Sequence, residues 1–262
     1  MSAWNFDSIP DQSGRIAIVT GANTGIGYET ARALARKGAW VILACRDLAK
    51  ASAAAARIQA EQPSGNVQAQ PLDLSDLESV ARFAERFAAE HDRLDLLINN
   101  AGVMVPPKSQ TKQGFELQLG TNHLGHFALT AHLLPLLRRT PGARVVVVSS
   151  GAHHMGHIDF ADLNFEGRGY SPWRAYAQSK LANLLFALEL QRRLRAAGAA
   201  VLVTAAHPGW TATDLQRTAG AARFFNPYFA MKPADGALPT LRAATDPAAS
   251  AGEYFGPSRL FE

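Results

Sequence analysis

Tyr176 and Lys180 lie four positions apart in the segment Tyr176-Ala-Gln-Ser-Lys180, which opens a stretch of regularly spaced leucines. Leu181, Leu184 and Leu188 recur with the period of an α-helix. Side chains four positions apart share one face of a helix, so the phenol and the ammonium are expected to lie close together. A neighbouring cation lowers the pKa of a tyrosine from about 10 toward neutrality. The pair could therefore act as a general acid and base, although the same spacing also arises by chance.

Two strongly apolar segments end in small polar residues. Ala143–Val148 is expected to be a central strand buried on both faces, and Ser149-Ser150 follow it. Leu94–Ile98 is expected to be another buried strand, and it is followed by Asn99-Asn100-Ala101-Gly102. Open α/β sheets bind their ligands at the carboxyl ends of the strands. These residues are therefore candidates for a ligand site.

A glycine-rich turn connects the first expected strand to the first expected helix. Arg15–Thr20 reads as the strand, Gly21-Ala-Asn-Thr-Gly25-Ile-Gly27 as the turn, and Tyr28–Lys37 as the helix. Glycines let backbone N–H groups approach a pyrophosphate, and a helix N-terminus attracts its negative charge. Tight turns also need glycine for conformational reasons alone.

Two further strands are expected at Ala39–Ala44 and Asn66–Pro71. Cys45-Arg46-Asp47 follow the first, whose tip faces the adenosine ribose in dinucleotide-binding folds. Leu72-Asp73-Leu74 follow the second, where Asp73 either borders an adenine pocket or caps a turn. Ser75-Asp-Leu-Glu78 has the form of a capping box that opens the next helix.

Asn122 lies within the long apolar segment Gly114–Arg139, where helix is expected. Asparagine is a poor residue for a helix interior because its side chain competes for backbone hydrogen bonds. A function would explain Asn122, and a position on the surface would explain it equally well.

Gly151–Arg174 reads as a loop that carries three histidines close to Asp159. His153, His154 and His157 suggest a metal site, but no fourth ligand of matching spacing is evident. Imidazoles that line a polar pocket are the favoured interpretation.

The helix that contains Tyr176 is expected to end near Gly198, before a sixth strand at Ala199–Ala205 and the segment His207-Pro208-Gly209. Residues 210–232 include Trp210, Phe224, Phe225, Tyr228 and Phe229 without a clear period. They form either a packed loop or a lid over an apolar ligand. A last helix at Pro233–Ala244 and a last strand at Glu253–Phe255 follow.

Strands that alternate with amphipathic helices predict an α/β fold in one domain spanning residues 1–262. We expect a doubly wound, Rossmann-type, mostly parallel sheet of about seven strands, with helices on both faces.

Composition excludes several classes of protein. The net charge is +4 and the basic residues are scattered, so nucleic-acid binding is not favoured. No apolar run approaches the ~20 residues that a membrane span needs. The single cysteine, Cys45, cannot form an internal disulfide, so a reducing, cytoplasmic location is expected.

These motifs together resemble the short-chain dehydrogenase/reductase family over about residues 14–256. Thr20–Gly27 is similar to the family's cofactor turn, Asn99–Gly102 to its strand-four motif, and Tyr176-x-x-x-Lys180 to its active-site pair. The sequence of the segment Asn122-His-Leu-Gly-His-Phe127 is similar to that of the retinol dehydrogenase-like branch. Ser150 and Tyr176 are 26 positions apart, a long interval that this branch shares.

The resemblance implies a catalytic set and a cofactor site. Tyr176 exchanges the proton, Ser150 binds the carbonyl oxygen, Lys180 keeps the tyrosine acidic and binds the nicotinamide ribose, and Asn122 anchors a water. The implied cofactor-binding residues are Gly21, Asn23, Thr24, Gly25, Ile26, Gly27, Arg46, Asp73, Leu74, Asn100, Ala101, Gly102, Tyr176, Lys180, Pro208, Gly209 and Thr213.

Arg46 predicts the choice of cofactor. NAD-specific proteins commonly place a carboxylate at the tip of the second strand, whereas a guanidinium can bind the 2′-phosphate of NADP(H). Asp47 could still reach the ribose if the strand ended later, and Thr24 stands where many NADP-using relatives carry a second basic residue.

The sequence therefore predicts an NADP(H)-dependent oxidoreductase that interconverts an alcohol and an aldehyde or ketone, with a bulky apolar substrate. A reductase of small carbonyl compounds and a non-catalytic cofactor-binding regulator are the alternatives. Apolar residues on more than one face of the helices that carry Asn122 and Tyr176 predict a homodimer or homotetramer.

Overall fold

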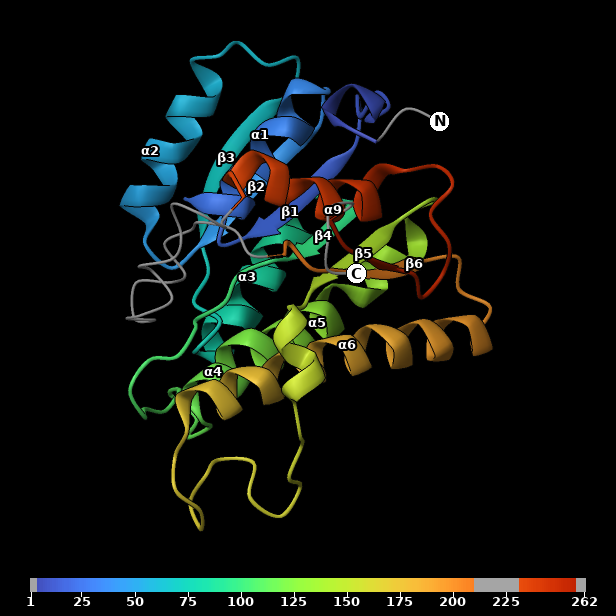
Figure 1. The fold of residues 1–262 in the computed structure, drawn as a ribbon. Helices are drawn as coiled ribbons and strands as arrows, with labels where there is room; N and C mark the ends of the chain where they lie inside the picture. Colours follow the sequence, from blue (N-terminus) through green and yellow to red (C-terminus); the bar gives the residue numbers. More distant parts are fainter. Residues whose placement is uncertain (1–3, 210–230, 258–262) are drawn as a thin grey trace.

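The computed structural model describes residues 4–209 and 231–257, and its centre is one seven-stranded sheet (Figure 1). The strand order is β3-β2-β1-β4-β5-β6-β7, and every neighbouring pair is parallel. The strands are β1 (Ile16–Thr20), β2 (Trp40–Cys45), β3 (Asn66–Pro71), β4 (Leu96–Asn99), β5 (Arg144–Val148), β6 (Leu202–Ala206) and β7 (Tyr254–Phe255).

Helices cover both faces of this sheet. Buried residues of α1, α2 and α9 pack on one face, and those of α3, α5 and α6 pack on the other. The helical elements are η1 (Phe6–Ser8), α1 (Gly25–Arg36), α2 (Leu48–Gln59), α3 (Leu77–Glu90), α4 (Leu117–Leu119), the π-helix η2 (Gly120–Leu124), α5 (Gly125–Arg139), the 3₁₀-helix η3 (Gly151–Met155), α6 (Pro172–Ala196) and α9 (Pro233–Thr245).

The burial of strand β1 on both faces explains why Ile16–Val19 are apolar at every position rather than at alternate ones. Ala17 and Val19 pack in the core beneath α1 and α2, whereas Ile16 and Ile18 pack in the core beneath α3 and α5. A strand covered on both faces has no side exposed to water. The predicted doubly wound parallel sheet is confirmed.

The strand order reverses between β1 and β4, which lie side by side in the middle of the sheet. The chain progresses through β2 and β3 in one direction and through β5, β6 and β7 in the other. The carboxyl ends of β1 and β4 therefore border the crevice in which doubly wound folds bind ligands.

Two helix starts differ from the sequence prediction. α1 begins at Gly25, within the glycine turn, and not at Tyr28. The predicted capping box at Ser75 is wrong, because Asp76 is the N-cap of α3 and its side chain accepts from Glu78 N at 3.0 Å. Ser75 instead donates both its backbone N–H and its hydroxyl to Asp73.

The segment predicted as loop at 151–174 contains the 3₁₀-helix η3 and the first turn of α6. Ser171 is the N-cap of α6 and Pro172 is its first residue, a position that tolerates proline because its N–H would have no helical partner. α6 ends at Ala196, and Gly198 follows with a φ of +65°. The predicted glycine stop is therefore correct.

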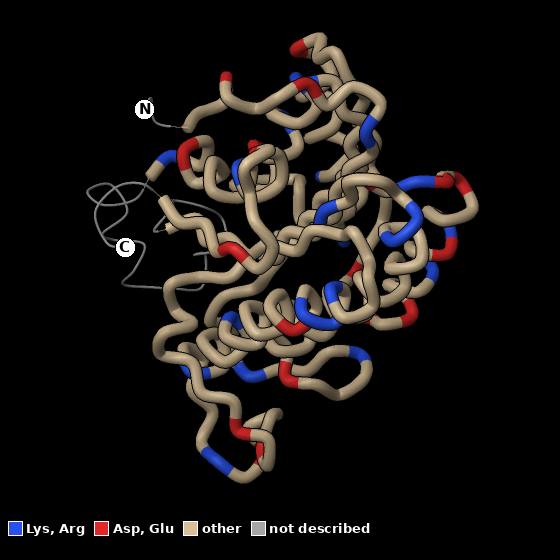
Figure 2. Tube along the Cα trace, turned by 90° about the vertical axis from the view of Figure 1, so that its right-hand side faces the viewer, with Lys and Arg blue, Asp and Glu red and all other residues tan. Residues whose placement is uncertain are grey.

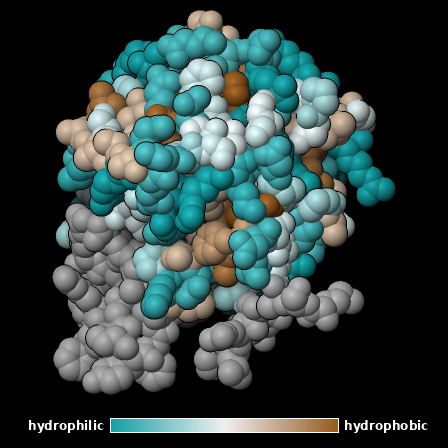
Figure 3. All heavy atoms as spheres, turned by 90° about the horizontal axis from the view of Figure 1, so that it is seen from above, coloured by the Kyte–Doolittle hydropathy of each residue, from teal (hydrophilic) through white to brown (hydrophobic). Residues whose placement is uncertain are grey.

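Charged residues of both signs are interspersed along the described trace (Figure 2). The basic pair Arg192 and Arg193 is partly compensated, since both side chains donate to the one carboxylate of Glu189. The face seen from above is mostly hydrophilic, with hydrophobic residues in small separated groups (Figure 3). Among the described residues no helix combines the length and the apolar character that crossing a membrane requires.

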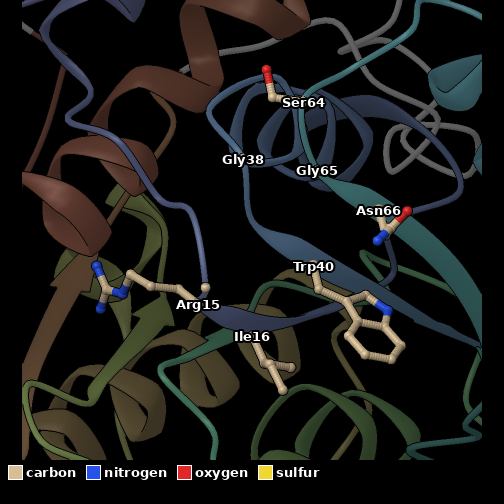
Figure 4. A pocket seen from close by; sticks show the side chains of 8 residues that line it. Arg15, Ile16, Gly38, Trp40, Ser64, Gly65 and Asn66 are labelled. Carbon is tan, nitrogen blue, oxygen red and sulfur yellow. The ribbon is translucent and has the colours of Figure 1, made fainter.

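A hollow of about 270 Å³ opens at the amino ends of β1, β2 and β3 (Figure 4). Ile16, Trp40 and Asn66, the first residues of these strands, line it together with Arg15. It contains none of the predicted site residues, which follow the opposite, carboxyl ends of the strands.

Candidate active site

The glycine turn packs closely against the residues that follow β4. Gly21 has a φ of +66°, and a Cβ on it would lie 2.9 Å from Ala101 Cβ. A Cβ on Gly27 would lie 2.5 Å from Asn100 Nδ2 and 2.6 Å from Gly21 O. Side chains are therefore excluded from this part of the turn, and the N-terminus of α1 lies within it, as the pyrophosphate of a dinucleotide requires. The predicted turn residues fit such a cofactor.

Thr20, the last residue of β1, holds the strand-four motif in place. Its hydroxyl oxygen accepts from the backbone N–H groups of Asn100 and Ala101, each at 2.9 Å. Asn100 Nδ2 donates to Thr20 O at 2.8 Å. Sequence reasoning used Thr20 as the end of a strand and the start of the cofactor turn, and nothing in the sequence showed that two distant amides would converge on its hydroxyl.

Asn122 is fully buried in the π-helix η2. The sequence left open whether this asparagine lies on the surface, and the structure shows that it does not. Its Oδ1 accepts from Val103 N at 2.8 Å, and its Nδ2 donates to Val103 O at 3.0 Å and to Ser179 Oγ at 2.9 Å. The side chain thus joins α6 to the segment after β4. A π-helical turn inside a helix frequently marks a functional site.

Gly102 permits the close approach of Asn122 and Lys180. A Cβ on Gly102 would lie 3.1 Å from Asn122 Oδ1 and 3.7 Å from Lys180 Nζ. The amide, the ammonium and the strand-four motif therefore meet at one point, although they belong to three separate segments of the chain.

Tyr176 and Ser150 lie beside the same lysine. Tyr176 is 4% exposed and Lys180 3% exposed, and the lysine Nζ lies 5.8 Å from the centroid of the tyrosine ring. Lys180 Nζ donates to Val148 O at 3.2 Å. Tyr176 and Ser150 share a side-chain hydrogen bond. The four predicted catalytic residues are therefore brought into one neighbourhood.

The pKa of Tyr176 differs from the sequence prediction. Burial raises it to about 12, and the hydrogen bond with Ser150 opposes that rise. Burial also lowers the pKa of Lys180 to about 8. Desolvation outweighs the effect of the nearby cation here, because it penalises the charged form of both groups. At neutral pH the tyrosine is therefore protonated and able to donate.

The family model for short chain dehydrogenases matches residues 15–223. The chain belongs to this family. Human retinol dehydrogenase 13 is 52% identical over 207 residues, which are 79% of this chain and 62% of that protein. Mouse polyprenol dehydrogenase is 48% identical over 249 residues, which are 91% of this chain and 74% of that protein. The predicted retinol dehydrogenase-like branch is confirmed.

Solved structures agree with this assignment. A protein of Mycobacterium paratuberculosis has 47% identity and a TM-score of 0.81, with 98% of this chain and 85% of that chain covered. A short chain dehydrogenase of Shigella flexneri, solved in complex with NADP, has 29% identity and a TM-score of 0.73, with 94% of this chain and 98% of that chain covered. The chain spans 62% of the length of human retinol dehydrogenase 13.

Met104 and Val105 form an apolar wall beside the tyrosine of this short chain dehydrogenase. Together with Tyr176 they make a small buried cluster, against which Ala152 packs. Val105 has a φ of +48°, which is unusual for a β-branched residue, and its N–H donates to Gln118 Oε1 at 2.9 Å. Strained backbone of this kind is often found at ligand sites.

The chain segment between Ser150 and Tyr176 is anchored to this wall through Gln118. The amide nitrogen of the fully buried Gln118 donates to Tyr170 Oη at 3.1 Å and to Pro172 O at 2.9 Å. Tyr170 Oη in turn donates to Glu116 Oε1 at 3.0 Å. Sequence reasoning missed Gln118 and Val105, because their partners are up to 54 positions away.

The predicted histidine cluster forms hydrogen bonds and ring contacts. His153 Nδ1 lies 2.7 Å from Ser150 O and 3.4 Å from Tyr254 Oη. Ser149 Oγ donates to Lys180 O at 2.7 Å, and it also shares a hydrogen bond with Tyr254. Within residues 4–209 and 231–257 no three His, Cys, Asp or Glu side chains are grouped to hold a metal ion. Ser149 and Tyr254, the second of which was not predicted as a site residue, brace the segment that carries Ser150.

The predicted residues near the adenosine end have distinct positions. Asp73 Oδ1 accepts from Ser75 N at 2.9 Å and from its hydroxyl at 2.6 Å, so Asp73 caps a turn. Leu74 is buried, and its carbonyl oxygen packs against Gly125. Asp47 is the N-cap of α2 and accepts from Lys50 N at 3.0 Å.

Pro208 and Gly209 follow β6, as predicted. Gly209 has a φ of +63°, and its N–H donates to His207 Nδ1 at 3.3 Å. Thr213 and the aromatic residues of the predicted lid lie outside the described residues. Of the segment 210–232, the structure describes only positions 231 and 232.

Replacing Lys180 with Met should stabilise the protein near neutral pH. Lys180 has a pKa of about 8 when folded against 10.5 for an ordinary lysine, so its charged form costs stability below pH 8. That cost is relieved as the pH rises from about 8 to 10.5, where the unfolded state binds more protons. Val148 O keeps a bond from Asn183 Nδ2 at 3.2 Å in the variant.

We therefore expect Lys180→Met to have the higher Tm at about pH 7 and the difference to narrow toward about pH 10. Thermal unfolding at a series of pH values measures this. A Tm difference that is the same at every pH would show that burial of the charge is not its cause.

Proposed function

We propose that this short chain dehydrogenase is an NADP(H)-dependent oxidoreductase that interconverts an alcohol and an aldehyde or ketone. The observation that carries the proposal is the buried Tyr176, which is bonded to Ser150 and lies beside Lys180. These residues border the crevice at which the strand order reverses.

In carbonyl reduction, the reduced nicotinamide supplies a hydride to the carbonyl carbon. Tyr176 donates its phenolic proton to the carbonyl oxygen, and in alcohol oxidation both transfers reverse. Its raised pKa keeps that proton in place at neutral pH. The Ser150 hydroxyl donates a hydrogen bond to the same oxygen, a contribution of about 2–4 kcal/mol if it resembles other oxyanion donors.

Lys180 and Asn122 support the proton transfer. Lys180 binds the nicotinamide ribose and then returns a proton to Tyr176. The side chain of Asn122 is engaged by Val103 and Ser179, so its main-chain carbonyl is the group that anchors a water between Lys180 and solvent. Burial of Lys180 beside Tyr176 lowers the stability of the protein. A cofactor-binding regulator without catalysis would gain nothing from that arrangement, so the buried pair favours an enzyme.

The proposed substrate is bulky and apolar. Met104 and Val105 present an apolar surface beside Tyr176, and similar proteins are named for retinol and for polyprenol. A reductase of small carbonyl compounds is the alternative. The aromatic residues at 210–232 are a further proposed source of apolar contact.

Tyr176→Phe removes one hydroxyl and little volume, so folding and NADPH binding should survive. Turnover should fall by about 10²–10⁴-fold, the usual contribution of a general acid. NADPH consumption with all-trans-retinal, decanal and acetaldehyde measures turnover and substrate size together. We expect the two larger aldehydes to have the higher kcat/KM. Wild-type turnover in the variant would disprove the role of Tyr176, and equal efficiency across the aldehydes would favour the small-carbonyl alternative.

The proposed preference for NADP(H) rests on Arg46 and Asp47. Arg46 follows β2 and is exposed, and its side chain makes no ion pair or hydrogen bond with residues 4–209 and 231–257. Asp47 is held by the start of α2 and by Lys50 Nζ at 3.0 Å. Its carboxylate is therefore engaged away from the strand tip, which leaves the guanidinium as the charged group available for a 2′-phosphate.

Arg46→Ala should raise the KM for NADPH by about 10-fold and leave the KM for NADH nearly unchanged. The expected loss is about 1–3 kcal/mol, the value of a hydrogen bond to a charged group. Steady-state kinetics with both cofactors measures it, with Lys50→Ala as a control that removes a neighbouring cation. Equal losses for NADPH and NADH would assign Arg46 to structure, and a wild-type enzyme faster with NADH would contradict the preference.

The proposed homodimer or homotetramer uses the outer face of α5 and α6. Phe127 of α5 is 51% exposed, and Leu185 and Leu188 of α6 are 47% and 45% exposed. Phe127 also contacts Phe186 of α6, with ring centroids 5.4 Å apart, so the two helices share an apolar contact near these exposed residues. Such surfaces commonly pair with a second copy.

Light scattering at micromolar concentration should give the mass of a dimer or tetramer. Leu185→Glu should dissociate it, because a charge would be buried at the interface. Leu48→Glu is the matched control, since Leu48 is 43% exposed but lies on α2. A monomeric wild type would refute the proposal, as would equal behaviour of the two variants.

The single-domain organisation of residues 1–262 and the cytoplasmic location stay predictions. The one sheet of the described residues supports the first, and the free, buried Cys45 is compatible with the second.

A further inference from the structure

His126 is a buried imidazole that the proposed reaction does not use. It is 1% exposed and lies in the first turn of α5, directly after the π-helix that contains Asn122. Its Nδ1 is 2.9 Å from the main-chain oxygen of Asn122, and its Nε2 is 2.8 Å from Thr20 Oγ1. The ring therefore lies between a residue of the proposed catalytic set and the end of β1.

The hydrogen bonds of His126 have only one consistent direction. A carbonyl oxygen can only accept, so Nδ1 carries the proton and donates to Asn122. Burial lowers the pKa of His126 to about 4, so the ring is neutral and Nε2 is an acceptor. The Thr20 hydroxyl lies 2.8 Å from Nε2 and 3.3 Å from the main-chain oxygen of Ile98, so its single proton goes to the nearer acceptor, Nε2, while its oxygen accepts from Asn100 N and Ala101 N.

This chain of bonds connects the two halves of the site. The N–H groups after β4 donate to Thr20, Thr20 donates to His126, and His126 donates to the carbonyl of Asn122. The carbonyl of Asn122 belongs to a π-helical stretch, and the Nδ1–H of His126 is a side-chain donor that can fix where this carbonyl points. The amide side chain of Asn122 is held separately by Val103 and Ser179.

We propose that His126 is a positioning residue, whose Nδ1–H aims the main-chain carbonyl of Asn122 and joins it through Thr20 to the strand-four motif. This inference rests on the proposed function, in which that carbonyl anchors the water beside Lys180. Thr20 is the second positioning residue of the same chain, and it acts on the cofactor side.

Two amide substitutions separate this role from simple packing. His126→Asn places an amide nitrogen where Nδ1 stands, so it can still donate to Asn122 O, but it leaves a larger cavity. His126→Gln fills more of the cavity and reaches toward Thr20, but it loses the donor at the Nδ1 position. The hydrogen-bond role therefore predicts that Asn is the better replacement, and a packing role predicts that Gln is better.

We expect kcat to fall about 10-fold in His126→Gln and His126→Leu, and to stay within about 3-fold in His126→Asn. The dissociation constant for NADPH, from fluorescence titration, should change little in all three, and Tm should be lowest for Asn or Leu. A kcat in Gln equal to or above that in Asn would overturn the proposal, as would a kcat that follows Tm across the three variants.

Thr20 provides a test that does not depend on the His126 variants. Thr20→Val removes the hydroxyl at nearly constant volume and leaves Asn100 N and Ala101 N without their acceptor, so NADPH binding should weaken about 10-fold. Thr20→Ser keeps the hydroxyl and should bind normally. Unchanged binding in Thr20→Val would remove the link to the cofactor side.

Nitrogen NMR of the wild-type protein tests the tautomer directly. We expect His126 to carry its proton on Nδ1 throughout about pH 5.5–8, and a proton on Nε2 would contradict the bond to Asn122. The Tyr176→Phe variant distinguishes a failure of the proposed function from a failure of the positioning role of His126. An active Tyr176→Phe enzyme refutes the proposed function, whereas an inactive one with unaffected His126→Gln kinetics refutes only the positioning role.

Discussion

The amide of Asn122 is the interaction on which the rest of the site depends. It is fully buried, and its three hydrogen bonds reach the backbone of Val103 in both directions and the hydroxyl of Ser179 on α6. One side chain thus fixes the segment after β4 against the helix that carries Tyr176 and Lys180. A buried amide with all its bonds made is rigid, whereas one with a bond missing would be costly, so the three segments are held in one arrangement.

The buried charge and the unusual backbone of the site are energetically unfavourable, and neighbouring groups offset part of this. Burial opposes the charge of Lys180 and the ionisation of Tyr176, as the shifts of their pKa values show. Lys180 is partly compensated by the carbonyl of Val148 at the end of β5. Val105 adopts an unusual backbone conformation beside the tyrosine and is held there by Gln118. Polar networks outside the catalytic set therefore stabilise a locally unfavourable arrangement.

Family membership and local geometry answer different questions about this protein. The match to short chain dehydrogenases and the parallel sheet assign the scaffold. A scaffold alone does not assign a substrate, which depends on the side chains around the reacting atoms. Met104 and Val105 are the buried apolar residues that pack with Tyr176, and the segment that precedes α6 is anchored through Tyr170. The proposals on cofactor and substrate accordingly rest on individual side chains.

The sequence by itself determined the succession of strands and helices along the chain, the glycine turn, and the placement of Tyr176 and Lys180 on one helix face. These features follow from local periodicity, from the conformational freedom of glycine and from the geometry of a single helix. Only the tertiary structure decided that Asn122 is buried and that burial raises the pKa of Tyr176. It also revealed Thr20 and His126, whose bond joins positions 106 apart in the chain. Contacts and desolvation of this kind depend on which distant segments meet, and no local pattern records that.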